Sequence, residues 1–244
     1  MAVKSSSTAA RVLTVFEAVA ANEPVGVAEL SRMLEIDKSA VQRALVTLSE
    51  QGWIQAREDQ MTRWETTARI LNIAHSSRAK SDLRHTIQLT LEQLAVQTGE
   101  TAIFNESDGK QLVVSQVAES RQALRMAPRI GTTVPARDSA TGRILLPFLS
   151  IERQTELLGG PPDAEFLALL DACRARGYAA SSEVNAPSMT IAAPVFEVDG
   201  RPIGVVAISG PTERMPVDSH PRLAEMVCQA ANLLSRGAPQ PAKA

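Results

Sequence analysis

The chain has few cysteine and histidine side chains, the types that form disulfides and bind zinc and similar metal ions. Its 244 residues include only two cysteines, Cys173 and Cys228, and three histidines. Both cysteines lie in helical patterns beside apolar neighbours, which favours reduced, buried thiols over a disulfide. The histidines share no ligand spacing with the cysteines. We therefore expect neither a metal site nor a bound cofactor.

Long apolar runs are absent as well. No run reaches the ~18 residues that a membrane helix needs. The N-terminal sequence MAVKSSSTAAR also lacks the apolar stretch of a signal peptide. A content of 44% hydrophobic and 21% charged residues is typical of a soluble globular protein. These observations predict a cytoplasmic protein without a membrane partner, built from one large domain or two ordinary ones.

Residues 26–66 carry the most informative pattern, which is two short helices followed by two short strands. The first helix is expected at residues 28–34, with an apolar face formed by Leu30, Met33 and Leu34. Asp37 can cap the second helix, because its carboxylate can accept from free N–H groups two or three residues on. Gly52 ends that helix. Its apolar side is formed by Val41, Ala44, Leu45 and Leu48.

The opposite side of the second helix is polar over its first two turns. In helix-turn-helix proteins such positions face base edges in the major groove of DNA. Residues 53–56 and 63–66 are predicted strands around a polar tip of Glu58, Asp59 and Gln60, as in a wing. Arginines beside that tip are suited to phosphate contact. We therefore predict a winged helix-turn-helix that binds double-stranded operator DNA through Lys38, Ser39, Gln42, Arg43, Arg57 and Arg63.

A strong excess of positive charge is missing from this region. Residues 1–80 hold 10 Lys and Arg against 9 Asp and Glu, a net charge of +1. The remainder holds 15 against 18, a net charge of −3. A near-neutral unit has modest non-specific affinity for DNA per copy. Tight binding is therefore expected to need two or more copies on one DNA, as in a homodimer or homotetramer.

The chain is expected to divide into two domains joined by a helix. Before the helix-turn-helix, a helix at residues 8–21 has a buried face formed by Val12, Val15, Phe16 and Val19. A polar stretch at residues 75–81 marks the boundary. The predicted parts are a disordered tail at 1–7, a winged helix-turn-helix domain at 8–66, a linker helix at 67–81, an effector-binding domain at 82–236 and a loose tail at 237–244.

The second half has the pattern of an α+β domain with an antiparallel sheet. Asp199 and Gly200 give the strongest hairpin signal in the chain, and Gly109 supplies the turn of another hairpin. Ser139 can cap a helix that runs to residue 149. The predicted helices are 83–98, 139–149, 163–176 and one from about 216 to 235. The predicted strands are 101–105, 111–117, 190–198 and 202–209.

With both halves in view, the chain resembles the IclR family of bacterial transcription regulators over residues 8–236. The segments that carry the resemblance are DKSAVQRALVTLSEQGW, RIGTTVPARDSATGRILLPFLS, RARGYA, TIAAPVFEVDGRPIGVVAISGP and the final helix. The resemblance implies an effector-binding domain similar to the GAF fold, with a six-stranded sheet flanked by helices. It also implies dimers or tetramers that sense small organic molecules.

Several positions near the implied pocket depart from the family pattern. Arg137, Asp138 and Ser139 stand where the family usually has His-Ala-Thr or His-Ala-Ser. Ser181, Ser182 and Glu183 replace an acidic stretch, and Thr190 replaces a Cys or Ser. Effectors of better-known members are therefore not transferred to this chain. From the resemblance, the effector-binding residues are Met126, Val134, Thr141, Gly142, Thr190 and Ser209.

The residue types at this pocket indicate a small organic acid. A helix start near Ser139 favours an anion, because free N–H groups and the positive end of the helix dipole lie there. Hydroxyl groups favour further oxygen atoms on the ligand, and Met126 with Val134 favours an apolar body. Hydroxylated aromatic acids and short keto acids fit. The loss of the usual charged residues favours the aromatic class. Arg137 could add a salt bridge or could point to solvent.

Three functional classes are consistent with a DNA-binding domain joined to a ligand-binding domain. The leading one is a ligand-responsive transcription regulator of a catabolic operon. The alternative is an enzyme acting on a small organic acid with an accessory DNA-binding domain. Against it, the second half contains no GxSxG motif, no His–Cys pair and no paired-His metal site. The third is a sequence-independent architectural DNA binder, and the near-neutral charge argues against it.

Overall fold

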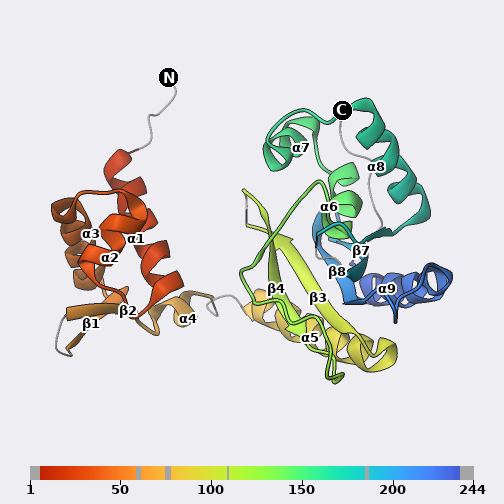
Figure 1. The fold of residues 1–244 in the computed structure, drawn as a ribbon, viewed down its shortest axis with the longest axis horizontal. Coiled ribbons are helices and arrows are strands. Elements are labelled where there is room, and N and C mark those ends of the chain that lie inside the picture. Colours follow the sequence, from red (N-terminus) through yellow and green to blue (C-terminus); the bar gives the residue numbers. More distant parts are fainter. Residues whose placement is uncertain (1–5, 59–61, 75–77, 109, 185–186, 237–244) are drawn as a thin grey trace. The chain divides into compact units, whose positions relative to one another are not determined.

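A computed structural model describes residues 6–58, 62–74, 78–108, 110–184 and 187–236. The chain forms two compact units, Met1–Ser81 and Asp82–Ala244, which we call the N-terminal and the C-terminal unit (Figure 1). Several predictions fall outside the described residues. They concern most of the two tails, Asp59 and Gln60 at the wing tip, residues 75–77 of the linker, and Gly109. None of the described helices is long and apolar enough to cross a bilayer.

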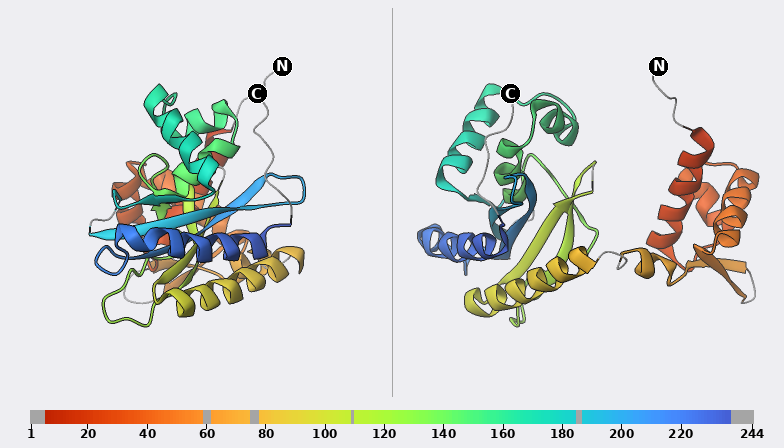
Figure 2. Two further views of the ribbon diagram at one scale, coloured as in Figure 1. Left: turned by 90° about the vertical axis from the view of Figure 1, so that its right-hand side faces the viewer. Right: turned by 180° about the vertical axis from the view of Figure 1, so that it is seen from behind.

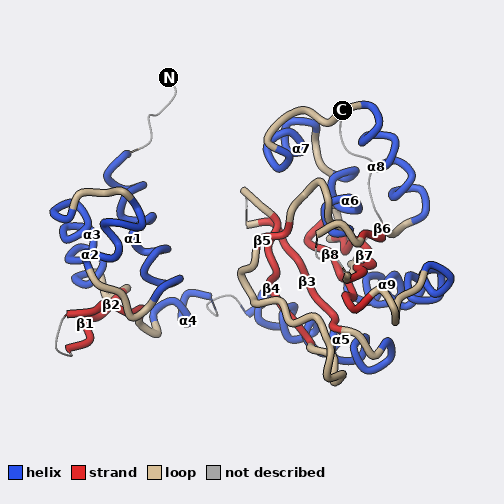
Figure 3. The backbone as a smooth tube through the Cα atoms, viewed as in Figure 1, coloured by secondary structure: helices blue, strands red, loops and turns tan. Residues whose placement is uncertain are grey.

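The N-terminal unit contains the predicted helices and the predicted hairpin (Figure 3). Its elements are α1 Ser7–Asn22, α2 Val27–Leu34, α3 Lys38–Glu50, β1 Ile54–Glu58, β2 Thr62–Thr66 and α4 Arg69–Ala74. The Ser6 hydroxyl caps α1 by accepting from the N–H of Ala9. Ser6 and Ser7 therefore belong to the helix and its cap, rather than to the predicted tail. Gly52, at φ +75°, follows α3 in the left-handed conformation that glycine adopts without strain.

The core of the N-terminal unit joins α1, α2 and α3 to the hairpin. Its buried members are Val15, Val19, Val25, Leu30, Val41, Ala44, Leu45, Leu48, Ile54 and Trp64, and Val12, Phe16 and Leu34 pack against them. Met33, predicted on the apolar face of α2, is 50% exposed. Helix α2 has about two turns, and only its side with Leu30 and Leu34 packs against the core.

The C-terminal unit is an α+β domain whose sheet is wholly antiparallel. Its helices are α5 Arg78–Thr98, α6 Ala140–Leu145, α7 Ile151–Leu158, α8 Ala164–Arg176 and α9 His220–Leu234. The short 3-10 helices η1 Leu146–Phe148 and η2 Val217–Ser219 follow α6 and precede α9. Its strands are β3 Thr101–Ser107, β4 Leu112–Ala118, β5 Thr133–Val134, β6 Ala179–Ser181, β7 Ser188–Phe196 and β8 Pro202–Pro211.

Three details differ from the sequence predictions. Residues 78–81, predicted as the end of a linker helix, form the start of α5. The helix capped by Ser139 ends at Leu145 and continues as η1, where Pro147 interrupts α-helical bonding. No bounds were predicted for β5, α7 or β6. β6 has three residues, which is too short for an alternating pattern to stand out.

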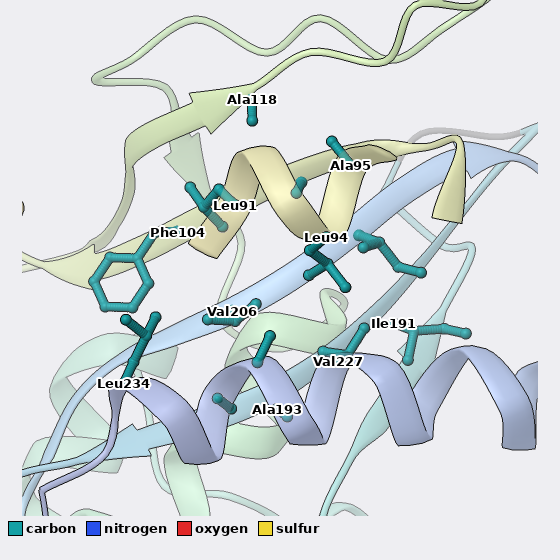
Figure 4. Packing of buried hydrophobic residues seen from close by; sticks show 14 of the residues in the cluster. Leu91, Leu94, Ala95, Phe104, Ala118, Ile191, Ala193, Val206, Val227 and Leu234 are labelled. Atoms are coloured by element: carbon teal, nitrogen blue, oxygen red, sulfur yellow. The ribbon is translucent and has the colours of Figure 1, made fainter. Parts of the chain in front are cut away.

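The six strands lie in the order β5-β4-β3-β8-β7-β6, with helices on both faces (Figure 2). Alternate residues of β8 explain this arrangement, because successive strand side chains point to opposite faces. Val206 enters the core beneath α5 and α9, where Leu91, Leu94, Val227 and Leu234 meet it (Figure 4). Ile208 belongs to the same core. Val205 and Ala207 enter a second core with Ala140 and Ile144 of α6. Strand β8 is therefore buried on both faces of the sheet.

Candidate functional site

The predicted reading residues share the outer side of α3, opposite the core. Lys38, Ser39, Gln42 and Arg43 are all exposed. Asp37 caps α3 by accepting from the N–H groups of Ser39 and Ala40, each at 3.0 Å, and from the Ser39 hydroxyl at 2.9 Å. These bonds, first among them the Ser39 N–H, hold the pKa of Asp37 below its usual value. Arg43 Nη1 donates to Ser39 Oγ at 3.2 Å, so the cap also orients a reading side chain.

The wing arginines lie opposite each other, with Arg57 of β1 paired to Arg63 of β2. The Arg63 guanidinium donates to Glu29 Oε1 at 3.0 Å and to the Pro24 carbonyl at 2.8 Å. The Gly26 N–H, followed by the charge of Arg63, keeps the pKa of Glu29 low. Arg63 therefore ties the wing to the start of α2. Its phosphate contact stays a prediction, and so does that of Arg57.

A cavity of about 100 Å³ lies in the C-terminal unit, on the α6 face of the sheet. Five of the six residues predicted to bind the effector line it: Met126, Val134, Thr141, Thr190 and Ser209. They come from the segment after β4, from β5, from α6, and from the paired strands β7 and β8. None of the described lining residues is charged. The cavity is therefore an uncharged space in which apolar side chains alternate with hydroxyl and amide groups.

The sixth predicted residue, Gly142, is not among those that line the cavity. A β-carbon at this position would overlap the carbonyl oxygen of Ala136. The Gly142 N–H is also occupied, because the Ser139 hydroxyl accepts from it at 3.0 Å. Gly142 thus allows the backbone of α6 to pass close to the turn before it. One N–H that was expected to attract an anion is bonded within the protein.

Two polar pairs sit at the cavity. The Asn105 amide Nδ2 donates to Thr141 Oγ1 at 3.2 Å, and both side chains are buried. Across the sheet, Thr190 Oγ1 and Ser209 Oγ lie 3.0 Å apart, on residues directly paired between β7 and β8. Asn105 was missed by the sequence analysis. The available signal was a single amide at the end of the buried strand AIFN, where an unpartnered polar group would be costly.

The side chain of Arg137 does not line the cavity. Its guanidinium forms an ion pair with Asp163, the N-cap of α8, and lies 4.5 Å above the Phe166 ring. This pairing is the main cause of the lowered pKa of Asp163. The side chain of Arg137 is half exposed. Of the two alternatives left open for Arg137, the structure favours the surface position, because its charge already has a partner at the start of α8 and it does not line the cavity.

Arg143 of α6 holds a second wall of the cavity in place. Its Nη2 lies 2.6 Å from Glu183 Oε2, and its Nε donates to the Arg137 carbonyl at 3.1 Å. The Arg143 side chain is only 12% exposed. Ser181, which lines the cavity, donates to the Asp138 carbonyl at 2.6 Å. The segment from Ser181 to Glu183 is thereby attached to α6.

The sequence of each unit matches a known protein family. Residues 8–58 match the IclR helix-turn-helix domain, and residues 75–236 match the bacterial transcriptional regulator IclR C-terminal domain. The transcriptional regulator KdgR of Dickeya chrysanthemi is 28% identical over 244 residues, covering 95% of this chain and 79% of that protein. The transcriptional repressor IclR of Escherichia coli K12 is 27% identical over 225 residues, covering 86% and 81%.

A solved structure shows the same fold. An IclR homolog from Microbacterium hydrocarbonoxydans, crystallised with 4-hydroxybenzoate, has a TM-score of 0.77 at 19% identity, covering 94% of this chain and 98% of that one.

These findings define a DNA-binding transcription regulator with a C-terminal ligand-binding domain. The chain belongs to the IclR family, because the C-terminal family model alone spans residues 75–236, well over half of it. The matched families and relatives are regulators and not enzymes, so the enzyme alternative is wrong.

Proposed function

We propose that this regulator responds to a small hydroxylated aromatic acid bound in the cavity of the C-terminal unit. The observation that carries the proposal is the placing of two polar pairs, Asn105–Thr141 and Thr190–Ser209, at a small and uncharged space. Because Thr141 Oγ1 accepts from Asn105, its hydroxyl proton remains to donate to a ligand oxygen. Met126, Val134 and Ile103 provide apolar surface for a ring.

Two further points support the aromatic class. The described lining residues carry no charge, so an acid would have to be recognised by hydroxyl, amide and backbone donors rather than by a guanidinium. A flat ring with oxygen atoms at both ends suits donors on opposite walls better than a short, flexible chain does. The homolog from Microbacterium hydrocarbonoxydans was crystallised with 4-hydroxybenzoate, a ligand of this description.

In the proposed mechanism, effector binding shifts the population between arrangements of paired DNA-binding units. The reading residues would be Lys38, Ser39, Gln42 and Arg43, with Arg57 and Arg63 near the phosphates. Two copies on a near-palindromic operator in the bacterial cytoplasm would supply the contacts that one near-neutral unit lacks. Mobility shift on an operator selected from random DNA, with and without 4-hydroxybenzoate, tests this. A changed operator affinity supports the proposal, and an unchanged one contradicts it.

Replacing Thr141 with Val should weaken effector binding at least fivefold, about 1 kcal/mol, by removing a hydroxyl at nearly constant volume. It also leaves the Asn105 amide without its acceptor. Calorimetry with 4-hydroxybenzoate and related acids measures the effect. Thr155→Val on α7 is the matched control, because the Thr155 hydroxyl serves only the Ile151 carbonyl and lies outside the cavity. Equal affinity in wild type and Thr141→Val would show that this cavity is wrongly assigned.

The protein is also expected to be at least a dimer in solution. Leu13 of α1 and Leu71 of α4 are each 60% exposed, and large apolar side chains left at the surface favour burial against a second copy. Light scattering at micromolar concentration should return a mass of at least twice 26.1 kDa. Leu71→Glu should lower that mass and weaken operator binding together. A wild-type monomer that binds operator tightly would contradict the expectation.

A further inference from the structure

One wall of the cavity is formed by a segment that contains no helix or strand. Residues 119–132 connect β4 to β5 and supply Met126 and Pro128 to the lining. The segment has little apolar anchorage, because Leu124 is 70% exposed and Ile130 69% exposed. Its position must therefore be set by polar contacts.

The first group of contacts comes from the start of β3. Thr101, which is fully buried, donates its hydroxyl proton to the Met126 carbonyl at 2.5 Å. The same hydroxyl accepts from the Ser120 N–H at 3.1 Å. The Ser120 hydroxyl in turn donates to the Gly99 carbonyl at 2.5 Å. Thr101 is paired with Ser209 across β3 and β8, so this anchor adjoins the opposite wall of the cavity.

The second contact is an ion pair between the buried Glu100 carboxylate and the partly exposed Arg214 guanidinium. Arg214 follows β8, and its guanidinium donates to both carboxylate oxygens of Glu100 at 2.6 and 2.7 Å. It also donates to the Leu124 carbonyl at 3.0 Å. The Glu100 side chain is only 5% exposed. A β-carbon on Gly210 would overlap its carboxylate, so the glycine in the AISGP sequence of β8 makes the room that Glu100 needs.

We propose that Glu100 and Arg214 are positioning residues that hold the Met126 wall in its binding arrangement and so set effector affinity. Neither residue lines the cavity. The planar guanidinium of arginine can reach three acceptors at fixed angles, which a lysine ammonium or an amide cannot reproduce. The proposal rests on the proposed function for its effect on ligand affinity. Its effect on the wall itself is independent of any ligand.

The same segment supplies a matched control. Arg125 pairs with Glu119 at 2.9 Å, but both partners belong to the segment and both are well exposed. This pair does not attach the segment to the sheet. Arg125→Gln therefore removes one guanidinium from the wall without releasing it, whereas Arg214→Gln removes the attachment of Leu124.

The test uses full-length protein labelled with ¹³C at its seven methionine methyl groups. The Met126 resonance is assigned through Met126→Leu. Arg214→Gln should shift or broaden that resonance and should weaken 4-hydroxybenzoate binding about tenfold, because affinity falls with the fraction of molecules in the competent arrangement. Arg125→Gln should change neither. Operator binding without ligand should be unchanged in both variants.

Arg214→Gln leaves the Glu100 carboxylate buried without its partner. The double variant Glu100→Gln/Arg214→Gln, which removes that charge as well, is therefore measured beside it. If the single variant does not fold, the double variant tests the proposal. If the Met126 resonance of the folded variant is the same as in the wild type, the proposal is overturned, whether or not an effector has been identified. A displaced resonance with wild-type ligand affinity overturns it too. Failure of the wild type to bind any acid tested would contradict only the effector class, and the resonance alone would then decide the positioning role.

Discussion

Arg43→Ala should cost operator binding about 1–3 kcal/mol for each half-site contacted, without unfolding the protein. The guanidinium lies on the outer face of α3 and donates a hydrogen bond to the Ser39 hydroxyl of the same helix. Its loss therefore removes no core contact. Two copies on one operator would lose the contact twice, which makes this the largest effect on DNA binding that we expect from one substitution.

Mobility-shift titration against wild type measures this loss, and circular dichroism checks the fold. Arg222→Ala is the control, because Arg222 is an exposed arginine on α9 of the other unit. It removes the same charge but no reading residue. Gln42→Ala should act in the same direction, since glutamine pairs well with adenine. Wild-type affinity for both Arg43→Ala and Gln42→Ala would remove α3 as the reading helix.

The N-terminal unit could be predicted from local signals because each of its elements has one. Asp37 is followed by two N–H groups that need an acceptor, and Gly52 occupies a position with φ of +75°. Helical spacing of apolar residues then identified the buried side of α3. Arg63 shows where this reasoning stops. Its contacts with Glu29 and Pro24 join residues more than 30 positions apart, and no local pattern reports such a partner.

The cavity was harder to predict, because it depends on how distant segments pack. The family resemblance pointed to Met126, Val134, Thr141, Thr190 and Ser209, whose types also suit a small acid. Residue type alone could not distinguish residues that line the cavity from residues that hold its walls in place. A glycine beside the pocket suggests ligand contact as readily as close backbone packing, and an arginine suggests an anion site until its acidic partner is seen.

Gly142 is the position where this distinction has the largest expected consequence. Its α-carbon packs so close to the preceding turn that any β-carbon would overlap the carbonyl oxygen of Ala136. Both groups are backbone, so no side chain can move aside. Relief requires a shift of residues 135–142, which include Pro135, Ser139 and Thr141 of the cavity lining. Helix propensity alone would predict the opposite, since alanine is favoured over glycine by up to about 1 kcal/mol.

Gly142→Ala should therefore destabilise the C-terminal unit by about 1–3 kcal/mol or more and abolish effector binding. Calorimetric melting should show a lower transition for this unit, by about 2–4 °C for each kcal/mol lost. Gly160→Ala is the control, because nothing lies within 4 Å of a β-carbon there and its backbone needs no positive φ. That variant should melt as the wild type does. A Gly142→Ala protein with unchanged melting and unchanged ligand affinity would mean that α6 does not pack against the Ala136 carbonyl, and the cavity built on that packing would have to be redrawn.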